Sequence, residues 1–298
     1  MAYSPGGAPH GGATVPPPAL GDRRSRILEP LRQEGAKGVL LAVVSTVVVL
    51  GIVGWLVVRS ENWPAVREAF FNLDEFQDTF PDIFRRFGRN IRFFLIAEAF
   101  ILPFALLLAV MRSLPGPVFF PLRLMTIVYT DLFRGIPTVL IVYMLGFGVP
   151  TLGLPGVPTD PAVWGVVGLV LSYSAYVSEV YRAGIESVHP SQVASARSLG
   201  LSRSQSLRFV VIPQAVRRVV PPLLNDFVAL QKDTALIAFI VAVPEAFKMA
   251  QIQSAADFNY TPFLGAALMF LAITIPLTRF VDWLLARQRS RREAGAML

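Results

Sequence analysis

Long apolar stretches alternate with short charged segments over most of this chain. The first stretch, residues 38–58, has no charged side chain and supplies the roughly 20 residues that a transmembrane helix needs. Further predominantly apolar stretches lie at about residues 90–110, 118–149, 162–183, 222–247 and 262–285. The pattern predicts an all-α integral membrane protein with about six transmembrane helices.

The third stretch, residues 118–149, is too long for one straight crossing. It is interrupted at residues 133–137 by the sequence Phe-Arg-Gly-Ile-Pro. A break of this kind frees backbone polar groups, which membrane proteins tolerate where the chain lines a cavity. We therefore expect a broken helix there, with Arg134 at the break.

The segments outside the apolar stretches differ in character. Residues 1–37 begin with a Gly, Pro and Ala-rich part and end in a basic part, which predicts a disordered basic tail. Residues 59–89 are rich in Phe and mixed in charge, and we expect an outer interfacial segment with an amphipathic helix at about residues 65–76. A plain interfacial linker is the alternative. Residues 287–298 form a second basic tail.

Composition and charge agree with a membrane protein. Of the 298 residues 54% are hydrophobic and 16% are charged, against about 25% charged in a soluble domain. The net charge of +7 does not predict a nucleic-acid partner, because the basic residues flank the apolar stretches. Their distribution predicts a multi-pass membrane protein whose two termini both lie in the cytoplasm. With no cysteine, the chain has no disulfide framework.

One polar segment, residues 189–215, separates the fourth and fifth stretches. Pro190 suits the first position of a helix, and Gly200 suits the position just beyond a helix end. Ser202 and Gln205 have the spacing of a capping box, and Pro213 predicts the end of the second helix. The segment is therefore expected to form two short helices joined at Gly200, a compact knob on the membrane surface.

Charged and polar residues within the apolar stretches are costly and so are candidates for function. Asn225, Ala229 and Lys232 fall on one helical face, which could line a polar cavity; a Lys–Asp pair that only holds two helices together is the alternative. Arg134 suits a substrate carboxylate, or a structural acid. The predicted pathway candidates are Arg134, Glu179, Asn225, Lys232, Asp233 and Thr234. For Glu179 an interfacial ion pair is the simpler interpretation, and Glu98 has no evident role.

Several of these stretches resemble the permease subunits of polar amino-acid ABC importers. The sequences at residues 196–200 and 212–215 are similar to that family's cytoplasmic coupling loop, although Ala194 stands where the family has Glu. The interruption at residues 133–137 is similar to the family's Phe-Arg-Gly-Thr-Pro, and residues 232–236 to its Lys-Asp-Thr-Ser-Leu. Further similarities, at residues 175–185 and 221–227, keep the same order.

The resemblance implies a five-helix permease core at residues 90–286, with 38–58 as an additional N-terminal transmembrane helix. It implies four kinds of partner: an ABC ATPase subunit dimer, a second permease subunit, an extracytoplasmic amino-acid-binding protein and the lipid bilayer. The ATPase-coupling residues would be Ser191, Gln192, Ala194, Ser195, Ala196, Gly200, Arg203 and Pro213. Since this chain has no Gly-rich phosphate-binding loop, ATP and Mg are expected on the partner ATPase, with no cofactor or metal bound here.

Three other classes of function are weaker alternatives. A membrane-embedded enzyme would need a nucleophile–base pair or metal ligands, but the two histidines, His10 and His189, lie outside the apolar stretches. An ion-coupled secondary amino-acid carrier could use Glu98, Glu179 and Asp233. A purely structural subunit would not explain the broken third stretch. The identity of the transported amino acid stays open.

Overall fold

The computed structural model describes residues 35–240 and 243–296, and every regular element in that part is helical, which confirms the all-α class. Four of its helices are long and apolar enough to cross a membrane, or five when one bent pair counts as a single crossing. The predicted crossing at residues 222–247 is not among them. The chain divides into two compact units, with the boundary after Ala65.

The first unit contains α2 (Gly35–Val58), which includes the predicted crossing at residues 38–58. From Gly38 onward its faces are all predominantly apolar, as expected of a helix surrounded by lipid. Most of the predicted N-terminal tail, residues 1–34, lies outside the described residues.

The chain continues with α3 (Trp63–Phe70) and α4 (Leu73–Ser113), so the amphipathic helix predicted at residues 65–76 is interrupted. The interruption falls at Asn72, whose Oδ1 accepts hydrogen bonds from the backbone N–H of Asp74 (3.0 Å) and Glu75 (3.1 Å) and so caps α4. The predicted crossing at residues 90–110 is the second half of this longer helix. Residues 73–89, the second part of the predicted interfacial segment, form the first turns of α4.

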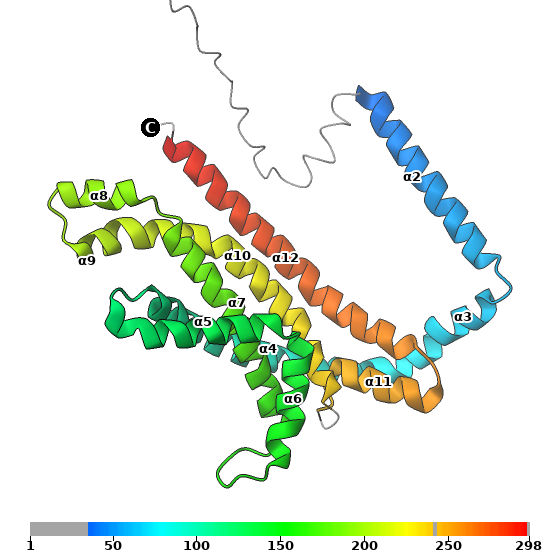
Figure 1. Cartoon of the computed structure of the whole chain (residues 1–298). Helices are drawn as coiled ribbons and strands as arrows, with labels where there is room; N and C mark the ends of the chain where they lie inside the picture. Colours follow the sequence, from blue (N-terminus) through cyan, green and yellow to red (C-terminus); the bar gives the residue numbers. More distant parts are fainter. Residues whose placement is uncertain (1–34, 241–242, 297–298) are drawn as a thin grey trace, which may run out of the picture. The chain divides into compact units, whose positions relative to one another are not determined.

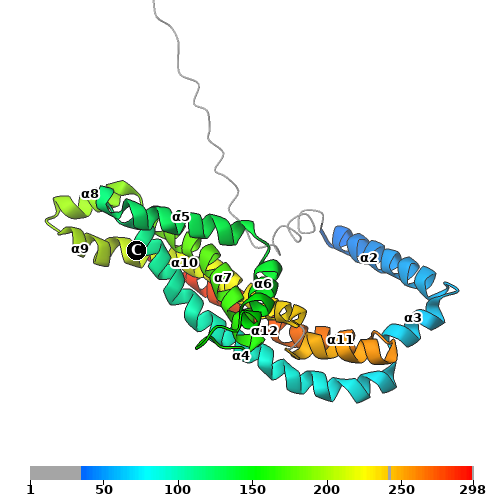
Figure 2. The same cartoon turned by 60° about the horizontal axis from the view of Figure 1, so that its bottom comes forward.

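The third stretch is broken as predicted. After the short 3₁₀ helix η1 (Pro117–Phe119), α5 (Phe120–Gly135) and α6 (Thr138–Thr151) meet at an angle of 100°. Figure 2 shows the chain turning at this break. Pro137 lies between the two helices and has no N–H to continue the hydrogen-bond ladder of α5.

The central helix of the second unit is α7 (Pro161–Glu186), which packs against α4, α5, α6 and α10. Asp160 caps it, and Pro161 occupies its first turn. At Gly168 an added Cβ would lie 2.9 Å from the Cα of Val142, so α6 and α7 approach closely. Small residues at such contacts are typical of helix pairs in membranes.

The polar segment folds as α8 (Pro190–Ser198), α9 (Arg203–Ser206) and the π-helical turn η2 (Leu207–Val211). The chain then passes without a break into α10 (Ile212–Asp233), and Figure 1 shows α8 and α9 at one end of α7 and α10. Pro213 therefore does not end a helix. It is the second residue of α10, directly after the π-helical turn η2, and the helix continues beyond it.

The fifth predicted crossing, residues 222–247, is wrong in its second half. Helix α10 ends at Asp233, and the 3₁₀ helix η3 (Thr234–Phe239) follows. A further helix, α11 (Ala246–Asp257), was not predicted, and α12 (Thr261–Ala296) contains the last predicted crossing. Helices α11 and α12 pack against the first half of α4.

Candidate coupling segment and pathway residues

The first helix of the polar segment, α8, has well-formed ends. The ring Nδ1 of His189 accepts a hydrogen bond from the backbone N–H of Ser191 (3.2 Å), and Pro190 occupies the first position. Beyond the C-terminus, the N–H of Gly200 donates to the carbonyl of Arg197 (3.0 Å), with Gly200 at φ +88°. That left-handed conformation favours glycine, so the predicted position of Gly200 just past a helix end is confirmed.

The second helix of the segment also begins as predicted. The Ser202 N–H donates to Oε1 of Gln205 (2.8 Å), and the Gln205 N–H donates to Oγ of Ser202 (3.3 Å), the reciprocal pair of a capping box. Since this helix continues through η2 into α10, the knob consists of one separate short helix and the first turns of a long one.

Apolar contacts fix α8 to the ends of α7 and α10. Val188, Val211 and Ala215 are buried together, with Val193 of α8 packed against them. One turn further along α7, a Cβ added at Gly184 would meet the side chain of Val219 on α10. Displacing α8 should therefore displace both long helices.

The surface of the knob is mostly polar or small. Of the predicted coupling residues, these are exposed: Ser191, Gln192, Ala194, Ser195, Gly200 and Pro213. Ala196 is 5% exposed, so it would position α8 rather than contact a partner, and the side chain of Arg203 lies outside the described residues. Leu199, which sequence reasoning did not select, is 84% exposed at the turn. The sequence did contain a signal for it, because Leu199 is an apolar residue directly before the glycine of the predicted turn.

Glu179 of α7 lies in a polar cluster that joins α7 to α4 and, through Arg112, to α5. Its Oε1 accepts from Nη1 of Arg112 on α4, and its Oε2 accepts from Nε (2.9 Å) and Nη2 (2.7 Å) of Arg182. Arg112 also donates to Oγ1 of Thr130 on α5 (3.4 Å), and Arg182 pairs with Glu186. This geometry favours the ion-pair interpretation of Glu179 over a substrate contact.

Arg134 and Asp233 both meet tyrosines of α7. The guanidinium carbon of Arg134 lies 5.7 Å from the centre of the Tyr176 ring, and Tyr176 donates to the Arg134 carbonyl (3.3 Å). Tyr173 donates to Oδ2 of Asp233 (2.7 Å). The Arg134 side chain is exposed at the break between α5 and α6, so it is available to a ligand.

The other pathway candidates fall into two groups. Asn225 and Lys232 are exposed on α10, and within the described residues no ion pair joins Lys232 to Asp233. Thr234 is completely buried; it donates to the Gln231 carbonyl (2.8 Å) and accepts from Nδ2 of Asn90 (3.2 Å). Thr234 is therefore not part of the exposed polar surface that Asn225 and Lys232 form on α10.

A buried polar network at the end of α10 escaped the sequence analysis. Asn90 of α4 donates through Nδ2 to Oε2 of Glu245 (2.7 Å) as well as to Thr234. Glu245 is completely buried and caps α11 by accepting from the N–H of Phe247 (2.9 Å) and Lys248 (2.7 Å). These residues are far apart in sequence, so only the Glu245 capping position could have been proposed from the sequence.

Glu98, for which the sequence indicated no role, lies on α4 close enough to Asp226 of α10 for their charges to interact. Oδ2 of Asp226 is buried and accepts no hydrogen bond among the described residues. The two carboxyl groups add acidic character to the interface of these helices.

The chain has several helices long enough to cross a membrane, and one crossing is broken beside Arg134. An exposed short helix, α8, is anchored to two of the long ones. These features are typical of a multi-pass subunit of a membrane transporter. The family model described as "Binding-protein-dependent transport system inner membrane component" matches residues 101–290, and the chain belongs to this family.

Individual relatives of the chain are also transport permease proteins. The chain is 38% identical to the probable glutamine ABC transporter permease protein GlnP of Bacillus subtilis (strain 168), over 62% of this chain and 84% of that protein. It is 31% identical to the glutamate transport system permease protein GluC of Corynebacterium glutamicum, over 67% and 91%. A crystal structure of an amino acid ABC transporter with histidines aligns with a TM-score of 0.63 and 25% identity, covering 73% of this chain and 98% of that one.

Proposed function

We propose that this chain is the permease subunit of an ATP-driven amino-acid importer and docks on a separate ATPase through α8. The proposal includes a second permease subunit and an extracytoplasmic binding protein as partners, with α8 and both termini on the cytoplasmic side. The printed names of the relatives, which include glutamine, glutamate and arginine transport proteins, support the substrate class.

The observation that carries the proposal is the anchoring of α8. A transporter driven by a separate ATPase needs a surface that the ATPase can hold and a rigid path from that surface to the crossing helices. Exposed Leu199 would provide an apolar contact at the tip. The cluster of Val188, Val211 and Ala215, with Gly184 against Val219, would transmit the movement to α7 and α10.

Only three of the six predicted pathway residues are kept as proposed substrate contacts. Arg134, Asn225 and Lys232 are exposed, so they are the residues proposed to contact the substrate. The positive charge of Arg134 or Lys232 suits the carboxylate that every amino acid carries, so it does not single out one amino acid. Glu179, Asp233 and Thr234 are proposed to hold the helices, because each already has partners on a neighbouring helix.

Reconstitution of the chain in liposomes with the neighbouring-gene ATPase and binding protein tests the proposal. ATPase activity is measured across a panel of amino acids, and stimulation by one or a few of them is expected. Transport that proceeds without the ATPase would support the ion-coupled carrier instead.

A pair of leucine variants tests docking separately. Leu199→Ser should weaken ATPase binding at least tenfold in a pull-down of the detergent-solubilised complex, because Leu199 is the exposed apolar group of the turn. Leu152→Ser is the control, since Leu152 is 64% exposed at the end of α6. Equal ATPase binding by both variants would contradict docking at Leu199.

A further inference from the structure

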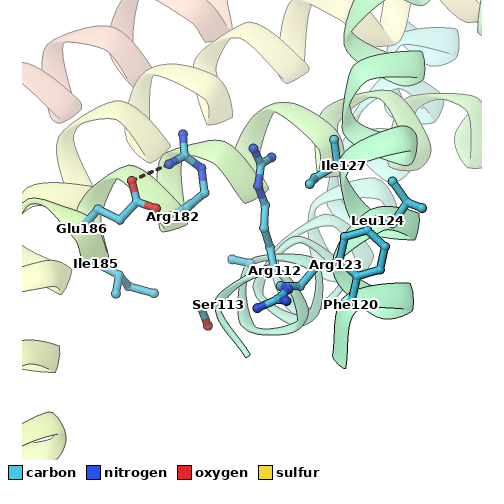
Figure 3. A pocket seen from close by; sticks show the side chains of 10 residues that line it. Arg112, Ser113, Phe120, Arg123, Leu124, Ile127, Arg182, Ile185 and Glu186 are labelled. Carbon is cyan, nitrogen blue, oxygen red and sulfur yellow. Dashed lines mark hydrogen bonds and ion pairs between the residues drawn. The ribbon is translucent and has the colours of Figure 1, made fainter. Parts of the chain in front are cut away.

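A pocket of about 390 Å³ lies between α4, α5 and α7 (Figure 3). Three arginines from three different helices line it: Arg112 near the end of α4, Arg123 in the first turns of α5, and Arg182 in the last turns of α7. Ser113 adds a hydroxyl group at its edge. Such a concentration of guanidinium groups favours an anionic ligand.

The positive charge of the pocket is only partly neutralised. Arg112 and Arg182 share Glu179, and Arg182 also pairs with Glu186. Arg123 makes no ion pair among the described residues; its Nη1 donates to the backbone carbonyl of Leu114 (3.0 Å). Three guanidinium groups thus face two carboxylates, and the N–H groups of Arg123 not used by Leu114 remain for a ligand.

The remaining wall of the pocket is apolar and open to the outside. Phe120 and Leu124 line it and are 56% and 46% exposed. The apolar surface continues along α5 through Met125 (65% exposed) and Val128 (57%). A free inorganic anion would gain nothing from this surface, whereas an acyl chain would bury it.

We propose that this pocket binds the phosphate group of an anionic phospholipid, with Arg123 as its main contact and an acyl chain along α5. Basic pockets between crossing helices are suited to such headgroups. Arg182 and Glu186 also belong to the part of α7 that leads into α8, so a bound lipid would stabilise one arrangement of α7 relative to the coupling segment. The binding itself does not depend on the proposed transport function.

Native mass spectrometry of the full chain in detergent measures this binding directly. The ligands are dioleoyl-phosphatidylglycerol, dioleoyl-phosphatidylcholine, dioleoylglycerol and inorganic phosphate. Phosphatidylglycerol is expected to bind at least tenfold more tightly than the other three, because only it combines a net negative headgroup with acyl chains. Equal binding of the two phospholipids, or binding of inorganic phosphate with the affinity of phosphatidylglycerol, would overturn the proposal.

Variants locate the site. Arg123→Gln should lower phosphatidylglycerol affinity about tenfold, and Arg123→Lys should retain most of it. Arg92→Gln, an exposed arginine elsewhere on α4, is the matched control and should leave the affinity unchanged. Should Arg123→Gln fail to fold, Phe120→Glu, which adds a negative charge at an exposed wall position, is expected to give the same loss. Wild-type affinity in whichever of these two variants folds would refute the site.

Discussion

The two ends of α10 are fixed by different means. At the end beside α8, the contacts are mainly apolar: Val211 and Ala215 pack with Val188, and Val219 lies against Gly184. One exposed hydrogen bond, donated by Nη1 of Arg218 to the backbone carbonyl of Ser187, adds to them. At the other end, Gln231 accepts from Thr274 of α12 (2.8 Å), and Thr234 belongs to the buried network of Asn90 and Glu245. The end beside α8 is therefore held mainly by apolar packing below an exposed surface, whereas the far end also contains a network of buried hydrogen bonds.

The difference indicates which end can move. Apolar packing loses little when helices slide by a fraction of an ångström, whereas a buried hydrogen bond depends on both distance and angle. A displacement of α8 would therefore move the near end of α10 while the buried network holds the far end. Of the two exposed polar residues of α10, Asn225 lies between these two points and Lys232 lies at the fixed end.

The largest effect is expected for Gly200→Pro at the movable end. Proline cannot adopt the φ of +88° found there and cannot donate the hydrogen bond to Arg197, so the turn between α8 and α9 would be lost. Amino-acid-stimulated ATPase activity should disappear while membrane insertion is retained. Wild-type transport at normal expression would contradict the coupling role of this turn.

Asn90→Ala should show that the fixed end carries stability. Removing the amide leaves the buried Glu245 without one donor and costs about 3 kcal/mol. The free energy of unfolding in detergent should fall accordingly, whereas Asn225→Ala, which truncates an exposed amide of α10, should change it little. Equal stability of the two variants would mean that the network is not a fixed point.

Gly184→Ala tests the packing between α7 and α10. The added methyl group would meet the side chain of Val219 and should cost about 2 kcal/mol. Adding Val219→Ala should recover part of that loss, because the smaller side chain makes room. Strictly additive losses in thermal unfolding of the two single variants and the double variant would argue against this close contact.

Lys232→Ala should have the smallest effect on assembly and a several-fold effect on transport. Lys232 is exposed at the fixed end and has no ion pair among the described residues, so its loss removes a charge without breaking a network. Lys248→Ala, beside the same end on α11, serves as the comparison. If the Lys232 variant instead fails to assemble with its partners, Lys232 holds the fixed end of α10 together and does not contact the substrate.

Local signals predicted much of this structure. The apolar runs at residues 38–58, 162–183 and 262–285 lie within single helices, and the Gly–Pro break falls where α5 and α6 separate. The turn at Gly200 and the capping box of Ser202 and Gln205 were likewise correct. These features depend on residues within a few positions of one another, which a sequence displays directly.

The errors concern features that depend on distant residues. The helix expected to run through residues 222–247 ends at Asp233, where Thr234 bonds to Asn90 on α4. The interpretation of Glu179 became clear only when α4 brought Arg112 to it. A charged residue in an apolar stretch therefore identifies a place of interest, but its partners decide whether it is a pathway or a structural residue.

Helix α4 has a consequence for how the protein fits its bilayer. Its 41 residues extend over about 60 Å, roughly twice the thickness of the hydrocarbon layer. The change from charged to apolar sequence occurs inside this helix, near Arg92, with no loop to absorb a difference in thickness. Hydrophobic mismatch must then be met by bending at Pro103, which lies in the apolar half, or by tilting the helix, and α11 and α12 would follow a tilt because both pack against α4.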